Sequence, residues 1–200
     1  GVLICENEQQ AADGVKEIML DKKFGASGNH VVVEEFLTGP EVSVLSFTDG
    51  KVVKPMVSSM DHKRANDHDT GLNTGGMGTI APNPYYTPAI AAECMEKIFL
   101  PTIQAMNAEG CPFKGCLYFG LMLTPDGPKV IEFNARFGDP ETEVVLPKLT
   151  SDLGAGISAI LDGETPEFTW DESNATLGVV IASNGCSADL TSAVNGVLGK

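Results

Sequence analysis

Arginine is scarce in this 200-residue sequence. Only Arg64 and Arg136 occur among 13 basic residues, which face 27 acidic ones, and the formal net charge is −14. Nucleic acids and anionic membranes are bound through clustered cations, so this balance argues against both kinds of partner. The sequence also lacks an apolar run long enough to cross a bilayer and has no signal-peptide pattern at its start. The composition, with 42% hydrophobic and 20% charged residues, is that of a globular protein.

Cysteine is also used sparingly. The five cysteines form no CxxC pair, and their number is odd. Reduced thiols explain this better than a disulfide framework does, which favours a cytoplasmic location. The chain opens on Gly1 rather than Met, within what reads as a strand, and ends just after another strand begins. We therefore expect a piece of a longer protein, with little catalytic activity of its own.

The apolar pattern predicts alternating helices and strands. The N-terminal part reads as a strand at 2–5, a helix over 8–24 and a strand over 31–37. A hairpin then joins strands 41–47 and 52–58 through Asp49-Gly50, and another joins 117–124 and 129–134 through 125–128. Helices are expected after Thr87-Pro88, with a kink at Pro101, after Asp139-Pro140 as far as about Leu149, and after Ser151-Asp152. A last strand, 175–182, is assigned to a following domain.

The segment 130–141, Val-Ile-Glu-Phe-Asn-Ala-Arg-Phe-Gly-Asp-Pro-Glu, carries the densest group of chemically active side chains. Alternation along a strand places Glu132 and Asn134 on one face, with Cα atoms about 6–7 Å apart. A carboxylate and an amide oxygen at that spacing suit Mg²⁺, which takes a few protein oxygens together with substrate phosphates. Arg136 follows and offers a guanidinium to those phosphates. The alternative is a strand with a solvated polar face, and we favour the metal site.

Two acidic residues, Glu34 and Glu35, leave the strand predicted at 31–37. Neighbours on a strand point to opposite faces, so these two carboxylates are poorly placed to act as an acid–base pair. Taken by themselves they read as solvated acids at a strand end.

The stretch 61–84 has no hydrophobic periodicity and is expected to be one long loop, a length that is usually functional. One interpretation is a His/Asp metal site built from His62, Asp67, His68 and Asp69, but no helical ligand spacing supports it. A second is an anion cradle in which Lys63 and Arg64 supply charge and the backbone of 75–78 supplies N–H donors. The third is a glycine-rich surface loop. No Walker or Rossmann phosphate motif occurs.

Together these segments resemble one family. Glu-Glu-Phe-Leu-x-Gly-x-Glu at 34–41, Asp-His-Lys-Arg at 61–64, Asn-Thr-Gly-Gly-Met-Gly at 73–78 and the motif of 130–142 occur in the order typical of the phosphoribosylamine–glycine ligase family of ATP-grasp enzymes. The likeness runs from about Gly1 to Leu153. It implies an α+β, ATP-grasp fold, with the rest of a small lid subdomain over 1–40 and the large antiparallel-sheet subdomain, including substrate loop 61–84, over 41–155. A linker helix and the start of a C-terminal domain would occupy 156–200.

The resemblance also implies roles for individual residues. The ATP site would comprise Glu34, Glu35, Phe36, Leu37 and Glu41, with Glu41 on the ribose hydroxyls. Glu132 and Asn134 match the ligands of Mg²⁺, with Mn²⁺ as an alternative, and Arg136 and Asp139 are the predicted catalytic residues. The residues that would receive glycine and 5-phosphoribosylamine are Asp61, His62, Lys63, Arg64, Asn73, Gly75 and Gly76.

The reaction implied is ATP-dependent joining of glycine to 5-phosphoribosylamine through a glycyl phosphate, which gives glycinamide ribonucleotide in purine biosynthesis. Phosphoryl transfer of this kind depends mainly on positioning and charge neutralisation. The sequence leaves open whether the parent protein is fused to other purine-biosynthesis enzymes. Two alternatives also stay open: another ATP-grasp carboxylate–amine ligase, or a non-catalytic nucleotide-binding module. Residues from Gly185 onward depart from the family pattern.

Overall fold

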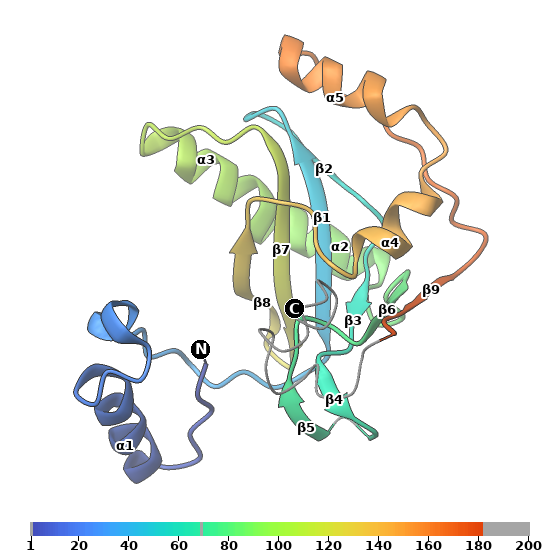
Figure 1. Ribbon diagram of the computed structural model, residues 1–200. Coiled ribbons are helices and arrows are strands. Elements are labelled where there is room, and N and C mark those ends of the chain that lie inside the picture. The colour runs from blue at the N-terminus through green and yellow to red at the C-terminus, as the bar shows by residue number, and fades with distance from the viewer. Residues whose placement is uncertain (1, 69, 182–200) are drawn as a thin grey trace, which may run out of the picture. The chain divides into compact units, whose positions relative to one another are not determined.

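The computed structural model describes residues 2–68 and 70–181, and the chain divides into two compact units, 1–38 and 39–200 (Figure 1). The first unit holds helix α1, Glu8–Met19, and a short 3₁₀ helix, Gly25–Asn29. Asn7 caps α1 by accepting a hydrogen bond from the backbone N of Gln10 at 2.9 Å. The helix ends before the predicted Phe24, because the chain turns out of helical geometry at Lys22, whose φ is 56°.

The strands predicted at 2–5 and 31–37 are not formed. Residues 2–5 and 31–37 are non-helical, but neither segment pairs with another strand within the described part of the chain. An extended segment becomes a strand only when its backbone N–H and C=O groups find partners on a neighbouring strand. The apolar, β-branched composition of 31–37 predicts a strand, but composition cannot supply the partner.

The centre of the second unit is an antiparallel sheet with strand order β2-β1-β7-β8. Its strands are β1, Glu41–Thr48, β2, Val53–Pro55, β7, Gly115–Thr124, and β8, Gly127–Asn134. Both predicted hairpins are confirmed. In the first, Asp49 accepts from the backbone N of Lys51 and Val52 at 2.7 and 2.8 Å, which fixes the turn into β2.

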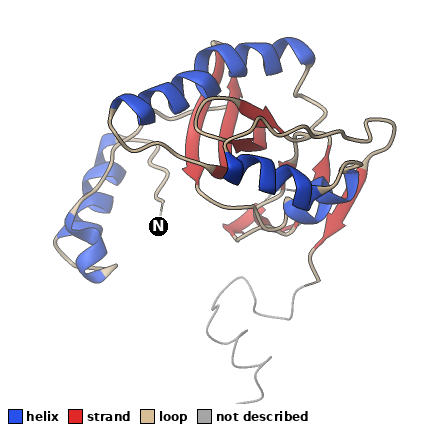
Figure 2. Cartoon of the chain, turned by 90° about the horizontal axis from the view of Figure 1, so that it is seen from above, coloured by secondary structure: helices blue, strands red, loops and turns tan. Residues whose placement is uncertain are grey.

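Helices cover one face of this sheet (Figure 2). They are α2, Pro88–Cys94, a π-helical turn, Met95–Phe99, and α3, Leu100–Ala108. Thr87 caps α2 as predicted. The expected disturbance at Pro101 takes the form of the wide π turn just before it, because proline lacks an N–H and its ring crowds the carbonyl four residues back. Phe99 packs on Phe119 of β7 at 4.2 Å between ring centroids, in the centre of this core.

The opposite face of the sheet packs against α4, Thr142–Val145, a 3₁₀ turn, Leu146–Lys148, and α5, Leu153–Asp162. Asp152 caps α5 as predicted, accepting from Ala155 N at 2.9 Å. The predicted helix is found as α4 and the 3₁₀ turn that directly follows it, which together reach Lys148, but the prediction that Asp139 caps it is wrong. The Asp139–Pro140 peptide bond is cis, the α-helix spans four residues only, and its N-cap position is Glu141.

The segment predicted as one long loop, 61–84, contains several short strands, so that prediction is also wrong. Strands β3, Met60–Asp61, β6, Gly78–Ala81, and β9, Thr176–Val179, make a second sheet, and β4, Arg64–Asn66, pairs with β5, Thr70–Asn73. Strand β9, which we assigned to a C-terminal domain, pairs with β6 in the second unit, with Gly78 opposite Val179. The domain boundaries at 40 and 155 stay predictions, and the divergent segment from Gly185 lies outside the described residues.

Candidate functional site

One half of the central sheet's face toward α4 is polar, and three neighbouring strands supply it. Ser43 of β1 lies opposite Gly120 of β7, and Gly120 lies opposite Glu132 of β8. Residues two apart on a strand share a face, so Glu41 joins Ser43 on this side, Tyr118 joins Gly120 and Asn134 joins Glu132. Farther along β1 the same face is apolar, with Leu45 and Phe47 in the core against α4.

Glu132 and Asn134 therefore share a face, as the sequence predicts. Phe133, between them, turns to the other side and meets Phe119 edge-on at 5.6 Å. The pairing of β7 with β8 shifts between Gly120 and Leu121, so Ile131 is an extra residue on β8 beside Glu132. Glu132 is exposed and Asn134 half-buried. An accessible carboxylate and an amide oxygen fit Mg²⁺. The described residues contain no group of three or more His, Cys, Asp or Glu side chains arranged to enclose a metal.

Glycine at position 120 leaves the room that the Glu132 side chain occupies. A Cβ atom on Gly120 would lie 2.9 Å from Glu132 Cγ and 3.3 Å from Tyr118 Cε1, which is closer than ordinary packing. The absence of a side chain at Gly120 thus allows the aliphatic part of the Glu132 side chain to lie over this position. The sequence gives no sign of this, because a glycine within a strand is as often the mark of a bulge.

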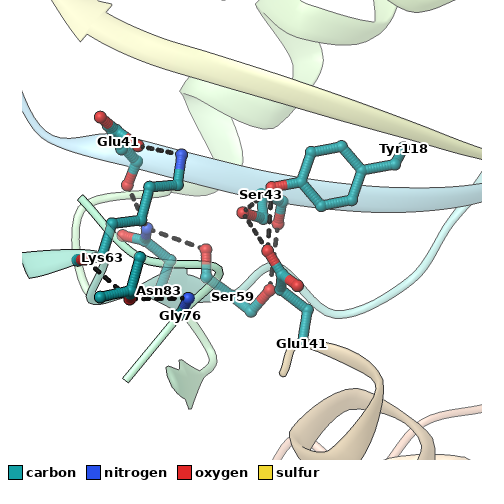
Figure 3. A network of polar contacts seen from close by, with 9 residues as sticks. Glu41, Ser43, Ser59, Lys63, Gly76, Asn83, Tyr118 and Glu141 are labelled. Carbon is teal, nitrogen blue, oxygen red and sulfur yellow. Dashed lines mark hydrogen bonds and ion pairs between the residues drawn. The ribbon is translucent and has the colours of Figure 1, made fainter. Parts of the chain in front are cut away.

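Lys63 and Glu41 form an ion pair beside this face. Lys63 Nζ lies 2.8 Å from Glu41 Oε2, and the two side chains are 30% and 42% exposed (Figure 3). Burial acts to lower the pKa of Lys63, but the hydrogen bond and charge of Glu41, together with the charges of Glu132 and Asp61, raise it. The lysine thus stays charged between three carboxylates drawn from β1, β3 and β8.

Asp61, in β3, carries a carboxyl oxygen without a partner. Its Oδ1 is buried and has no hydrogen-bond donor. Burial and then the charge of Glu141 raise the pKa of Asp61 to about 7, while Lys63 acts in the opposite direction. A buried oxygen left without a donor costs free energy, about 1–3 kcal/mol by mutational measures. Asp61 is therefore ready to accept a hydrogen bond from a ligand.

Three residues that the sequence analysis assigned no role lie behind this face. Tyr118 Oη lies 2.7 Å from Ser43 Oγ, and Glu141 Oε1 accepts from Tyr118 Oη at 2.9 Å and from Ser43 Oγ at 3.2 Å (Figure 3). All three side chains are 5% exposed or less. Burial and the charge of Glu141 raise the pKa of Tyr118, so its hydroxyl keeps its proton. Of the three, only Glu141 belongs to a sequence motif, that of 130–142. No local sequence pattern could connect it to Ser43 and Tyr118, which lie 98 and 23 residues earlier in the chain.

Asn83, also missed, joins the start of β1 to the segment before β3. Its Nδ2 donates to the carbonyl oxygens of Glu41 at 2.9 Å and Ser59 at 3.2 Å (Figure 3). Its Oδ1 accepts from Tyr85 N at 2.9 Å. The residue is 3% exposed. Asn83 thereby fixes the backbone of Glu41 relative to the segment that leads into Asp61 and Lys63.

The rest of the predicted substrate loop folds beside β3. His62 is held through its backbone, with its N donating to Gly78 O and its O accepting from Met77 N, both at 2.8 Å. Arg64 pairs with Asn73 across β4 and β5. Gly75 is exposed, whereas Gly76, at φ 131°, donates a hydrogen bond from its N to Thr74 Oγ1 and packs against Asp61 and Pro140. The His/Asp metal site considered for this loop finds no support in the described residues.

The two predicted catalytic residues lie in the turn between β8 and α4. Arg136 is exposed and its Nη1 donates to the carbonyl oxygen of the next residue, Phe137, at 2.9 Å. Asp139 is exposed as well, and precedes the cis-proline Pro140 that touches Gly76. The structure thus connects this turn to the loop 61–78, while their catalytic roles stay predictions.

The predicted adenine-side residues belong to the first unit and are described by themselves. Glu34, Glu35 and Phe36 are exposed and Leu37 is half-buried, and none of the four belongs to a helix or a paired strand. Phe36 is 68% exposed. The predicted role uses the backbone groups of this segment and stays a prediction.

This antiparallel sheet, with helices packed on both faces and half of one face left polar, has the fold of the ATP-grasp class. A solved L-amino acid ligase from Bacillus licheniformis shares the fold, with a TM-score of 0.60 at 17% identity over 92% of this chain and 43% of that one. The model of the phosphoribosylglycinamide synthetase ATP-grasp (A) domain matches residues 1–142, so the chain belongs to that family.

Individual relatives agree with this placement. A phosphoribosylamine–glycine ligase of Streptococcus pyogenes is 50% identical over 189 residues, which are 94% of this chain and 45% of the relative. The crystal structure of the phosphoribosylamine–glycine ligase of Thermotoga maritima has a TM-score of 0.79 at 30% identity, covering 92% of this chain and 46% of that one. The chain therefore spans less than half the length of these relatives. Among the described residues, no helix is both long and apolar enough to span a membrane.

Proposed function

We propose that the protein containing this chain joins glycine to 5-phosphoribosylamine at the expense of ATP and gives glycinamide ribonucleotide in purine biosynthesis. Family membership supports the proposal, as do the names of relatives 50% identical to the chain. The observation that carries it is the group formed by Glu132 and Asn134 on one sheet face, the Lys63–Glu41 pair beside them, and Asp61, whose Oδ1 has no hydrogen-bond partner. We also propose a cytoplasmic location and leave fusion to other purine enzymes open.

Within this function, Glu132 and Asn134 would hold Mg²⁺, or Mn²⁺ in its place. When bound, the ion supplies positive charge to the phosphates of ATP. Glu41, at the start of β1, would accept hydrogen bonds from the ribose hydroxyls, with Lys63 holding its carboxylate in place. Segment 34–37 would bind adenine through its backbone.

The chemical steps require positioning more than covalent help from the protein. The glycine carboxylate attacks the γ-phosphate of ATP, which forms glycyl phosphate and releases ADP. The amine of phosphoribosylamine then attacks the glycyl carbonyl, which forms the amide and releases phosphate. Arg136 would steady the transferred phosphoryl group with its guanidinium, and Asp139 would lie beside it in the same turn. Loop 61–78 would hold the two substrates and keep water from the acyl phosphate.

Glu132→Gln in the full-length protein tests the proposal. Glutamine keeps the size of the side chain but removes the anionic ligand, so product formation from glycine, phosphoribosylamine and ATP should fall by ~10²-fold or more, the scale on which removal of one stabilising charge acts. Glu143→Gln, an exposed acid on α4, is the matched control. Full activity of the Glu132 variant would favour a non-catalytic nucleotide-binding module. Wild-type activity with another amine or acid, and none with these substrates, would favour a different ATP-grasp ligase.

A further inference from the structure

Glu141 is an almost fully buried acid that the proposed reaction does not use. It is 3% exposed, and its Oε1 accepts hydrogen bonds from Tyr118 Oη at 2.9 Å and Ser43 Oγ at 3.2 Å. No cation pairs with it among the salt bridges of the described residues. Burying a carboxylate is costly even when hydroxyls donate to it, and an apolar side chain of similar size would avoid that cost. Stability of the fold is thus a poor explanation for an acid at this position.

The contacts of Glu141 join three segments that each carry a predicted site residue or lie directly beside one. Ser43 lies on β1, two residues after Glu41, and Tyr118 lies on β7 directly opposite Asn134 of β8. Glu141 itself ends the turn that contains Arg136 and Asp139. These partners lie 98 and 23 residues away in the sequence, so the carboxylate connects parts of the chain that local structure does not.

The turn is folded closely onto this carboxylate. A Cβ atom on Gly138 would overlap Glu141 Oε2, so glycine is needed for the backbone to pass so near. The carbonyl oxygen of Gly138 accepts from both the backbone N and the hydroxyl of Thr142, which closes the turn on the other side. Pro140, next to Glu141, touches Gly76 of the loop 61–78.

We propose that Glu141 is a positioning residue, which fixes the turn 136–140 against β1 and β7 so that Arg136 lies correctly relative to Glu132 and Asn134. This inference rests on the proposed function. Misplacement of a reacting group by about 1 Å costs ~10²-fold in rate, so an anchor of this kind acts on the chemical step more than on substrate binding.

The experiment compares Glu141→Leu, Glu141→Gln and Tyr118→Phe in the full-length protein. Leucine fills the space without accepting hydrogen bonds, so kcat should fall by ~10²-fold while KM for ATP changes less than about threefold. Glutamine keeps an oxygen that accepts from both hydroxyls, so it should restore kcat to within about tenfold of wild type. Tyr118→Phe keeps the ring and removes one donor, so it should lower kcat by an intermediate factor. It also tests the proposal if Glu141→Leu does not fold.

Exposed Glu143, two residues further on, supplies the matched control, because Glu143→Gln removes a charge from α4 without touching the cluster. The proposal is overturned if Glu141→Leu or Tyr118→Phe keeps wild-type kcat. It is also overturned if Glu141→Gln is as impaired as Glu141→Leu, or if kcat and every KM worsen together with a lower melting temperature. An inactive wild-type protein would instead refute the proposed function, and this inference with it.

Discussion

Lys63 Nζ and Glu41 Oε2 are 2.8 Å apart, which connects the loop after β3 to the first residue of β1. Both side chains are partly exposed, so the pair contributes less than about 1 kcal/mol to stability. The pair lies beside Glu132 and Asp61, so Lys63 also keeps a positive charge where the nucleotide is proposed to bind.

Lys63→Met should separate these two contributions. The free energy of unfolding should change by less than about 1 kcal/mol, while kcat/KM for ATP should fall by ~10-fold or more through loss of a charge-assisted hydrogen bond. Lys97→Met is the matched control, because Lys97 pairs with Glu93 at the same 2.8 Å on the helical face. Equal activity of the two variants would show that the Lys63–Glu41 pair is only a surface ion pair.

Asp61 gives a prediction about pH. Its pKa is about 7 in the fold, against an ordinary value of 3.8, so the folded state binds the proton more tightly than the unfolded chain does. Its contribution to stability is therefore fully present below about pH 4, declines as the pH rises, and is lost above about pH 7. Asp61→Asn imitates the protonated form and should raise the free energy of unfolding at pH 8 by about 1–3 kcal/mol, less than the ~4 kcal/mol that the full pKa difference sets.

Urea unfolding at pH 4, 6 and 8 measures this effect. The difference between Asp61→Asn and wild type should be close to zero at pH 4 and grow toward pH 8. Asp67→Asn, on an exposed acid of the same loop, should show no such trend. A variant less stable than wild type at pH 8 would mean that the Asp61 carboxylate is stabilised in its charged form.

The parts of the site that the sequence predicts are those that local chemistry determines. Strand alternation places Glu132 and Asn134 on one face, and Asp49-Gly50 closes a hairpin, because each depends on residues a few positions apart. Strands β3 and β6 escape prediction, since two to four residues are too few to show a period. Glu141 could not be predicted for another reason: its partner Ser43 lies 98 residues away in the sequence. Nor could the sequence show that Asp61 Oδ1 lacks a hydrogen-bond donor, because this depends on the folded structure.

Gly120 offers a test of the metal site in which neither proposed ligand, Glu132 or Asn134, is itself mutated. A methyl group at this position would meet Glu132 Cγ at 2.9 Å and displace that flexible side chain. Gly120→Ala should therefore raise the Mg²⁺ concentration that gives half-maximal activity by about tenfold, as outer-shell changes do at metal sites. The effect should vanish when Glu132 is already Gln, so a double-mutant cycle checks it. An undiminished effect of Gly120→Ala in the Glu132→Gln background would mean that the methyl group acts elsewhere.

Two adjacent glycines in loop 61–78 predict opposite results for the same substitution. Gly76 has φ 131°, and a Cβ there would overlap Pro140 and lie 2.8 Å from Asp61 Oδ1, whereas no atom lies within 4 Å of the Cβ position of Gly75. Gly76→Ala should lower the free energy of unfolding by about 1–3 kcal/mol, the cost of a strained backbone region, and Gly75→Ala should change it by less than about 0.5 kcal/mol. Urea titration measures both. Because the strain at Gly76 arises where the loop meets Pro140, equal stability of the two variants would mean that the loop does not pack against the turn that carries Arg136.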